Sequence, residues 1–175
     1  EPDLESRLAA GLAGGRLDAT VDADWAIHQT DVSFVCVGTP STVSGTLDLS
    51  FVRQVVRQIV AAVRSKPGSK PHALVFRSTM LPGSTRQLTE ELASDLCASG
   101  RLQVFYFPEF LREGTAVRDF EEPSLAALGT RDGVKAGVEL LPFFGAAPVV
   151  SWETAEMLKY ACNAFHAAKI TFANE

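Results

Sequence analysis

The stretch Val32-Ser-Phe-Val-Cys-Val-Gly-Thr-Pro40 decides how this chain folds. Residues 32–37 are nearly all apolar, which is typical of a strand buried on both faces of a parallel sheet. Gly38 and Pro40 then end the strand in a tight turn. Because ligands of open α/β sheets bind at the carboxyl ends of strands, this turn is a candidate ligand site with a hydroxyl at Thr39. A plain tight turn explains the same residues.

Short apolar runs alternate with longer segments of helical period along the rest of the chain, a pattern that indicates parallel βαβ units. We therefore predict a doubly wound, Rossmann-like α/β fold with a mostly parallel sheet. No G-x-G-x-x-G turn occurs, so the sheet is expected to lack its N-terminal strands. Strands are predicted at 32–37, 73–77, 102–107, 124–128 and 147–150, and helices at 4–14, 50–64, 85–98, 133–144 and from Ser151 to the end.

Two of these helices have distinct apolar patterns. The helix at 50–64 places Phe51, Val55, Ile59 and Val63 at four-residue steps, which predicts that this stripe faces the sheet. The final helix is apolar over most of its surface and is expected to be buried on several sides. We predict one domain at 1–150, followed at 151–175 by the start of a long helix.

The composition excludes several classes of protein. With 46% hydrophobic and 21% charged residues over 175 positions, the chain is expected to fold as a globular unit. A net charge of -5 argues against a nucleic-acid binder, which needs a cationic surface. The absence of a long apolar stretch or a leader-like start predicts a soluble, cytoplasmic protein without membrane contact.

The three cysteines are odd in number and lack the paired spacing of a disulfide framework or a metal site. A reducing compartment fits them best, and we predict no metal. None is expected to be a nucleophile: Cys36 is placed in a buried strand, Cys97 near the end of a covering helix, and Cys162 away from the polar side of the last helix.

Two further strand ends carry polar side chains. Arg77-Ser-Thr79-Met-Leu-Pro-Gly83 follows the second predicted strand, and Phe107-Pro-Glu109-Phe-Leu-Arg112-Glu113 follows the third. The second motif brings two carboxylates and a guanidinium within five residues, which suits proton transfer and phosphate binding. A solvated loop with a local ion pair is the alternative.

The last helix has one polar stripe. At 100° per residue, Lys159, Asn163, His166 and Asn174 fall within an arc of roughly 80°. Because a lone buried lysine is unfavourable, Lys159 indicates a polar or anionic ligand, or a carboxylate such as Glu109. A partly exposed face at a subunit or domain contact is the alternative. His166 alone is more often a packing residue than a base.

Taken in order, these segments resemble the UDP-glucose/GDP-mannose dehydrogenase family. The residues that carry the resemblance are Cys36-Val-Gly-Thr-Pro40, Arg77-Ser-Thr-Met-Leu-Pro-Gly83, Pro108-Glu-Phe-Leu-Arg-Glu-Gly-Thr-Ala116, Glu156-Met-Leu-Lys-Tyr-Ala-Cys-Asn163 and Lys169-Ile-Thr-Phe-Ala-Asn-Glu175, with the opening Glu1-Pro-Asp-Leu4. The last helix is closer to the GDP-mannose branch, through Phe165-His166-Ala167 and Phe172-Ala-Asn-Glu175. One departure is Phe107, where the family usually has Asn.

The resemblance implies an NAD-dependent, four-electron oxidation of a nucleotide sugar at C6, from GDP-mannose to GDP-mannuronate. It implies that residues 1–150 belong to the NAD-binding domain, that 151–175 begin a central helix which builds a homodimer or larger assembly, and that the Gly-rich turn and the nucleophilic cysteine lie outside this chain. The fragment alone is expected to be inactive. A UDP-glucose 6-dehydrogenase and a non-catalytic binding or assembly module are the alternatives.

The resemblance also implies roles for single residues. Thr39, Thr79 and Glu113 would contact NAD, and Thr79, Glu109, Lys159 and Asn163 would be catalytic. Lys159 and Asn163 would hold the oxygen on the reacting carbon. The substrate site would consist of Glu109, Phe110, Leu111, Arg112, Glu113, Lys159, Asn163, His166 and Asn174.

Overall fold

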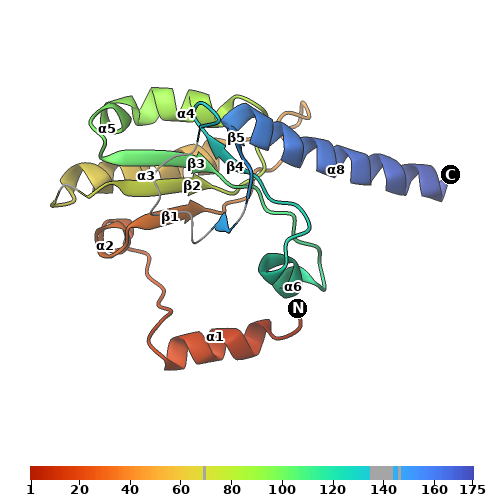
Figure 1. Ribbon diagram of the computed structural model, residues 1–175, viewed down its shortest axis with the longest axis horizontal. Coiled ribbons are helices and arrows are strands. Elements are labelled where there is room, and N and C mark those ends of the chain that lie inside the picture. The colour runs from red at the N-terminus through yellow and green to blue at the C-terminus, as the bar shows by residue number, and fades with distance from the viewer. Residues whose placement is uncertain (69, 135–143, 146) are drawn as a thin grey trace.

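The computed structural model describes residues 1–68, 70–134, 144–145 and 147–175 and shows a five-stranded sheet in the order β1-β2-β3-β4-β5 (Figure 1). The strands are β1 (Val32–Val35), β2 (His72–Phe76), β3 (Leu102–Tyr106), β4 (Leu128–Thr130) and β5 (Val149–Ser151). The helices are α1 (Leu4–Ala13), α2 (Ala23–Gln29), α3 (Ser50–Ser65), α4 (Ser84–Leu92), α5 (Ser94–Ala98), α6 (Ala116–Glu121) and α8 (Trp152–Asn174). The predicted α/β class and the mostly parallel sheet are confirmed.

The sheet is parallel from β1 to β3, and β3 with β4 is its one antiparallel pair among the described strands. Val32 pairs with Ala73, and His72 pairs with Leu102, both in parallel register. β4 runs antiparallel to β3 through the pair Tyr106 and Gly129, then pairs with β5 in parallel. The bounds of the strand predicted at 124–128 are wrong. Residues 124–127 are irregular, and β4 begins at Leu128.

The burial of the strands follows their place in the sheet. All five residues of the central strand β2 are buried. In β1, at the end of the described sheet, only Val35 is buried and Phe34 is 43% exposed. The expected burial of this strand on both faces is wrong in the described structure: Val35 is buried on the face that the helices cover, whereas Phe34 points to the opposite face and is exposed. Cys36 follows the strand and is exposed, so its predicted place inside a buried strand is also wrong.

Helices cover the face of the sheet that carries the larger of two apolar clusters. Val35, Leu74 and Phe76 on the strands join the buried residues of α3, α4, α5 and α8 in this cluster. On the opposite face, a smaller cluster contains Ala73, Val75, Phe105, Leu128 and Phe144. The helix predicted at 133–144 falls mostly outside the described residues.

The helix α3 turns most of the predicted stripe toward the sheet: Ile59 and Val63 are buried and Val55 packs against the larger cluster, but Phe51 is exposed. Its buried residues include Val52, Val56, Ile59 and Val63, whereas Phe51 is 53% exposed. Steps of four residues drift by about 40° each on a helix of 3.6 residues per turn, so Phe51, three such steps before Val63, lies off the buried face. The residues that stay on one side follow steps of four, three and four.

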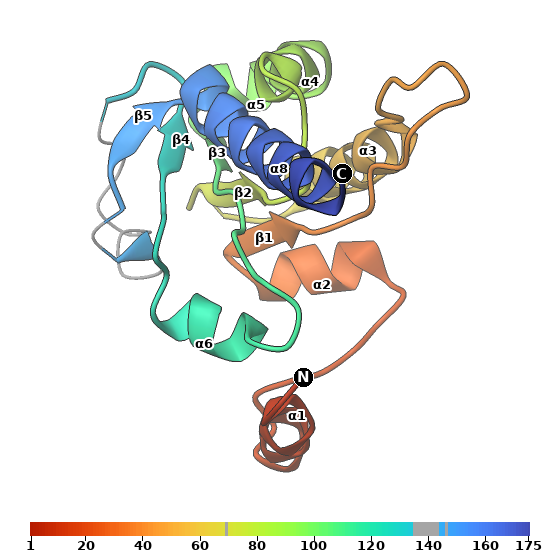
Figure 2. The same cartoon turned by 90° about the vertical axis from the view of Figure 1, so that its right-hand side faces the viewer.

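Two short helices were not expected from the sequence. Asp22 begins α2, where its side chain accepts a hydrogen bond from the Trp25 N–H. α6 follows Thr115. The helix predicted at 85–98 is real but divides at Ala93 into α4 and α5. α1 has no buried residue and stands apart from the sheet in both views, with Arg7 paired to Glu121 at the end of α6 (Figures 1 and 2).

α8 begins as predicted and then departs from the expectation. Ser151 is its N-cap, with the side chain accepting a hydrogen bond from the Thr154 N–H. Only Trp152, Ala155, Glu156 and Lys159 are buried. The C-terminal half is exposed and projects away from the sheet (Figure 1). The expected burial on several sides therefore holds for the first two turns alone.

Candidate active site at the carboxyl ends of the strands

The loops after β1 and β2 lie against each other. The Thr39 hydroxyl donates a hydrogen bond to the Thr79 carbonyl oxygen at 2.9 Å, and the Ser78 hydroxyl donates to the Val37 carbonyl oxygen at 2.6 Å. A Cβ atom built on Gly38 would meet no described atom within 4 Å, so the turn faces open space. The two threonines that the sequence predicts near a cofactor are thus neighbours at one edge of the sheet.

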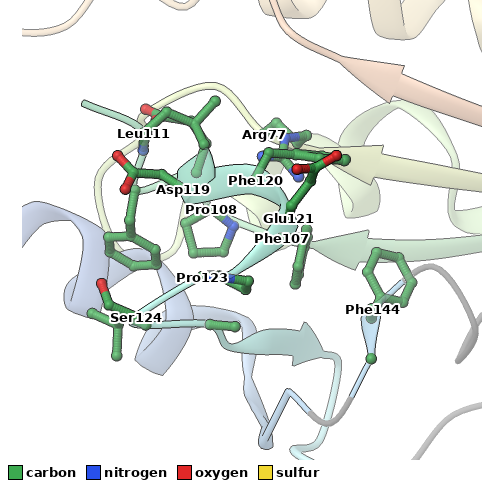
Figure 3. A pocket seen from close by; sticks show the side chains of 15 residues that line it. Arg77, Phe107, Pro108, Leu111, Asp119, Phe120, Glu121, Pro123, Ser124 and Phe144 are labelled. Atoms are coloured by element: carbon green, nitrogen blue, oxygen red, sulfur yellow. Dashed lines mark hydrogen bonds between the residues drawn. The ribbon is translucent and has the colours of Figure 1, made fainter. Parts of the chain in front are cut away.

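A first pocket lies beside these loops, on the face of the sheet with the smaller apolar cluster. It has a volume of about 260 Å³, and Arg77, Phe107 and Phe144 form part of its wall (Figure 3). The Arg77 guanidinium lies 5.1 Å from the centre of the Phe107 ring, and Phe107 lies 4.7 Å from Phe144, centre to centre. Burial lowers the pKa of Arg77, with Cys36 and Glu109 opposing that shift. The residue that departs from the family pattern, Phe107, thus packs between a cation and a ring.

Glu109 and Lys159 form the central polar contact of the site. The Lys159 Nζ donates to Glu109 Oε1 at 2.8 Å, and the side chains are 7% and 33% exposed. Lys159 also lies over the Phe110 ring, 5.4 Å from its centre. Glu109 Oε2 accepts a second hydrogen bond from the Leu111 N–H at 2.8 Å. The partner that the sequence suggested for a buried Lys159 is confirmed.

The environment of Glu109 favours its ionised form. Burial alone would raise the pKa of this carboxyl. The hydrogen bonds from Lys159 and Leu111, and the positive charges of Lys159 and Arg77, outweigh burial and leave the pKa of Glu109 below its ordinary value. The site therefore holds a carboxylate and an ammonium in contact.

A second pocket opens on the other side of Phe110 and also has a volume of about 260 Å³. It unites most of the predicted substrate residues: Phe110, Leu111, Arg112, Lys159, Asn163 and His166. Cys162 lines it as well, so its predicted position away from the polar side of the helix is wrong. Three predicted residues lie elsewhere: Glu109 lines the first pocket, Glu113 is exposed and lines neither pocket, and Asn174 is exposed near the far end of α8.

Arg112 has a partner that the sequence reasoning missed. Its Nε and Nη2 atoms donate to the Asp119 carboxylate at 3.0 and 2.6 Å, and its backbone N–H donates to the same group. Thr115 adds a fourth hydrogen bond. These donors hold the pKa of Asp119 far below its usual range. The local ion pair proposed as the alternative for this loop is therefore present, and Arg112 lines the second pocket at the same time.

Glu156 is a second residue that the sequence reasoning missed. It is 0% exposed on α8 and accepts hydrogen bonds from the Gly83 N–H, the Thr85 N–H and the Thr85 hydroxyl. A carboxylate one turn before a buried lysine was the available signal. Its partners lie more than seventy positions earlier, so no local pattern identified them.

Two kinds of feature are absent from the described part of the chain. No group of three or more His, Cys, Asp or Glu side chains is arranged to hold a metal ion within residues 1–68, 70–134, 144–145 and 147–175. Within the same ranges, no helix has the length and hydropathy needed to cross a membrane.

Known proteins match the chain throughout. GDP-mannose 6-dehydrogenase from Pseudomonas aeruginosa is 43% identical over 183 aligned positions, which cover 100% of this chain and 41% of that protein. UDP-glucose 6-dehydrogenase from Rhizobium meliloti is 34% identical and also covers the whole chain. This chain spans about two fifths of the length of these relatives.

Solved structures match the fold equally well. The ternary complex of GDP-mannose dehydrogenase from Pseudomonas aeruginosa superimposes with a TM-score of 0.87 and 41% identity, over 99% of this chain and 41% of that one. A UDP-glucose dehydrogenase from Pyrobaculum islandicum has a TM-score of 0.87 and 38% identity, over 99% of this chain and 40% of its own. Residues 1–141 match the model of the UDP-glucose/GDP-mannose dehydrogenase NAD binding domain, and the chain therefore belongs to this dehydrogenase family.

Proposed function

We propose that the full-length protein containing this chain oxidises C6 of a nucleotide sugar to a carboxylate, with GDP-mannose as substrate and NAD as hydride acceptor. The observation that carries the proposal is the Lys159–Glu109 pair, 2.8 Å apart, in which Lys159 lines the second pocket together with Asn163 and His166. The chain spans 41% of its GDP-mannose relatives, so this activity is assigned to the full-length protein.

The carboxyl ends of β1 and β2 have the space and donors that a dinucleotide needs. Gly38 leaves open space above the strand end, and Thr39 and Thr79 lie in contact beside it. We assign Thr39 and Thr79 to NAD, which supplies the hydride acceptor when bound. Glu113, exposed in the loop before α6, is assigned to the junction of cofactor and substrate.

The second pocket suits an alcohol that loses a proton and a hydride. Lys159 and Asn163 are donors on successive turns of α8, and both line this pocket. Held there, an ammonium and an amide stabilise negative charge that develops on the substrate oxygen. Glu109, kept ionised beside Lys159, is placed to order a water molecule or accept a proton.

Binding of the nucleotide sugar is assigned to the remaining pocket residues. Phe110 and Leu111 supply apolar wall, and His166 supplies a donor on α8. Arg112 is partly engaged by Asp119, which fixes the guanidinium plane and leaves its other edge for the ligand. Asn174, at the far end of α8, is assigned to a more distant part of the same ligand.

The exposed half of α8 supports an assignment of quaternary structure. The exposed half of α8 carries Phe165, Ile170 and Phe172 at 67%, 58% and 86% exposure, which suits burial against a second copy in a homodimer. We also assign the protein to the cytoplasm, where it would make the GDP-mannuronate used for a polysaccharide such as alginate.

A UDP-glucose 6-dehydrogenase is the second candidate, supported by the 34% identical relative.

The test is NADH formation by the full-length protein, with the Lys159→Met variant as the matched control. Two NADH per GDP-mannose, lost in the variant, support the proposal. Activity with UDP-glucose alone assigns the protein to the second candidate. If both nucleotide sugars bind and neither yields NADH, the oxidation is refuted and a binding module replaces it.

A further inference from the structure

The first two turns of α8 carry two buried ionisable side chains, one acidic and one basic. Glu156 is 0% exposed and Lys159 is 5% exposed. Three residues apart, they lie about 60° apart on the same side of the helix. Buried charges are unfavourable unless they are satisfied, so each of them needs a fixed partner in the surrounding loops.

Glu156 is satisfied by the segment that joins β2 to α4. Its Oε2 accepts from the Gly83 N–H at 2.6 Å, and its Oε1 accepts from the Thr85 N–H at 2.7 Å and the Thr85 hydroxyl at 2.6 Å. These are donors of the first turn of α4 and of the residue before it, which no carbonyl within α4 can satisfy. One carboxylate therefore fastens the start of α4 to the start of α8.

The fastened segment is the one that carries Thr79. Thr79 lies four residues before Gly83, and its carbonyl oxygen accepts the Thr39 hydroxyl. Between them Met80 is fully buried, and the Ser84 N–H donates to the Leu81 carbonyl oxygen, which closes a tight turn. Thr79 is therefore held by two contacts: its carbonyl oxygen accepts from Thr39, and the turn that follows it donates to Glu156 through the Gly83 N–H.

Lys159 fastens the same helix to the other loop of the site. Its ammonium contacts Glu109, in the loop after β3. The helix α8 therefore contacts both loops of the site. Through Glu156 it contacts the start of α4, after the loop that carries Thr79, and through Lys159 it contacts Glu109 in the loop after β3.

From this arrangement we propose that Glu156 is a positioning residue for the oxidation, one that sets the place of Lys159 relative to Thr79. The inference rests on the proposed function for its catalytic consequence. Displacement of a catalytic group by about 1 Å lowers rates by as much as 100-fold, so a fixed Glu156 contributes through Lys159 and not by touching the substrate. In a Glu156→Gln variant, the amide –NH2 would replace one acceptor oxygen and face an N–H donor.

Glu153 provides a matched control one turn earlier on α8. It forms an ion pair with Arg86 at 2.6 Å, and both side chains are 35% exposed. It too links α8 to α4, but it lies at the surface and away from the turn that follows Thr79. If Glu156 acted only by holding two helices together, Glu153→Gln and Glu156→Gln would differ in stability alone.

The experiment compares wild type, Glu156→Gln and Glu153→Gln in the full-length protein by three measurements. These are thermal unfolding, kcat and KM with GDP-mannose and NAD, and the rate of Lys159 acetylation by acetic anhydride, normalised to the exposed Lys169 on the same helix. For folded Glu156→Gln we expect kcat to fall about tenfold or more with the KM for NAD changed less than about threefold, and Lys159 to become several-fold more reactive. Glu153→Gln should match wild type in kcat and in Lys159 reactivity.

Each outcome decides the proposal. A folded Glu156→Gln protein with unchanged Lys159 reactivity, or with kcat within about threefold of wild type, overturns it. If this variant fails to fold, Thr85→Val and Thr85→Ser take its place: the loss should follow Thr85→Val, and Thr85→Ser, which keeps the hydroxyl, should restore it. If wild type forms no NADH, the proposed function fails, and Lys159 reactivity alone decides whether Glu156 positions Lys159.

Discussion

The Lys159 ammonium on α8 lies 2.8 Å from the Glu109 carboxylate in the loop after β3, and 50 positions of sequence separate the two residues. Lys159 is the more buried partner, with its side chain 7% exposed against 33% for Glu109. Removing either partner leaves the other as an uncompensated charge in a partly dehydrated site. The contact therefore determines both the local stability and the charge state of the site.

The coupling between these residues can be measured by a double-mutant cycle. Glu109→Gln and Lys159→Met should each lower the free energy of unfolding, and the double variant should be more stable than the sum of the single losses predicts, by about 1 to 2 kcal/mol. Urea unfolding at pH 7 of the four proteins gives this number. A coupling free energy of zero would show that the Lys159–Glu109 contact contributes nothing to stability.

The same cycle has a defined pH dependence. Because the folded pKa of Glu109 is below its ordinary value of 4.5, the stabilising coupling is present above that value. It is lost as the pH falls through the lowered pKa. Coupling measured at pH 5 should therefore equal that at pH 7, and a decline already between pH 7 and pH 5 would contradict the assignment.

His72, at the start of β2, should make the protein less stable in mild acid. It is 1% exposed, and burial, followed by the charge of Lys66, lowers its pKa from 6.5 to about 4. Between these values the unfolded chain binds a proton that the folded chain does not, so the free energy of unfolding falls as the pH drops, by at most about 3 kcal/mol. Below pH 4 this contribution is constant.

One variant separates His72 from the other titrating groups. His72→Leu should flatten the stability profile between pH 6.5 and pH 4. Urea unfolding at several pH values provides the profile. An equal slope in wild type and His72→Leu would assign the acid sensitivity to other residues.

Asp119 should control binding of the nucleotide sugar through Arg112. An Asp119→Asn variant loses the charge that accepts four hydrogen bonds from Arg112 and Thr115, so the loop that lines the second pocket should become mobile. We expect the KM for the nucleotide sugar to rise about tenfold, with kcat changed less than about threefold.

The control for this variant is Glu122→Gln, which removes an exposed ion pair with Arg118 at 3.8 Å, just after α6. Steady-state kinetics of the full-length protein should show no change in KM for it, because such surface pairs contribute little. A KM for Asp119→Asn equal to that of the control would remove Arg112 from the substrate site.

Gly129 should be intolerant of a side chain because α8 packs directly on β4. A Cβ atom there would lie 3.0 Å from the Ala155 Cβ, 3.2 Å from the Trp152 Cα and 3.2 Å from the Tyr106 Cβ. Gly129→Ala should lower the free energy of unfolding by about 1 to 3 kcal/mol. Gly38→Ala, where the added atom meets nothing within 4 Å, should change stability by less than about 0.5 kcal/mol. Chemical denaturation of both variants tests the contrast.

The sequence alone determined those features that depend on local chemistry. Apolar runs bounded by Gly and Pro located β1, β2 and β3, and Ser151 marked the start of α8. Because the carboxyl ends of parallel strands meet at one edge of a sheet, the strand pattern was enough to expect the loops around Thr39, Thr79 and Glu109 to lie together.

Several other features were decided by tertiary structure. The direction of β4, the exposure of Phe51 at the start of α3 and the exposure of Phe34 and Cys36 depend on which surfaces their neighbours cover, which the local pattern does not contain. The roles of Asp119 and Glu156 also depend on tertiary contacts that the sequence pattern does not show. A single carboxylate in a polar loop or at a helix start has no periodicity to identify its partner.

Lys159 shows which properties of one residue follow from the sequence and which follow from the tertiary structure. The helical period placed Lys159 on a polar stripe with Asn163, and the unfavourable energy of a lone buried ammonium required a partner. That the partner is Glu109, and that Glu156 on the same face is fastened to Gly83 and Thr85, depends on loops brought together across 50 to 73 positions of chain. The spacing of side chains around a helix follows from the local sequence, whereas their hydrogen-bond partners are set by the packing of the sheet and its helices.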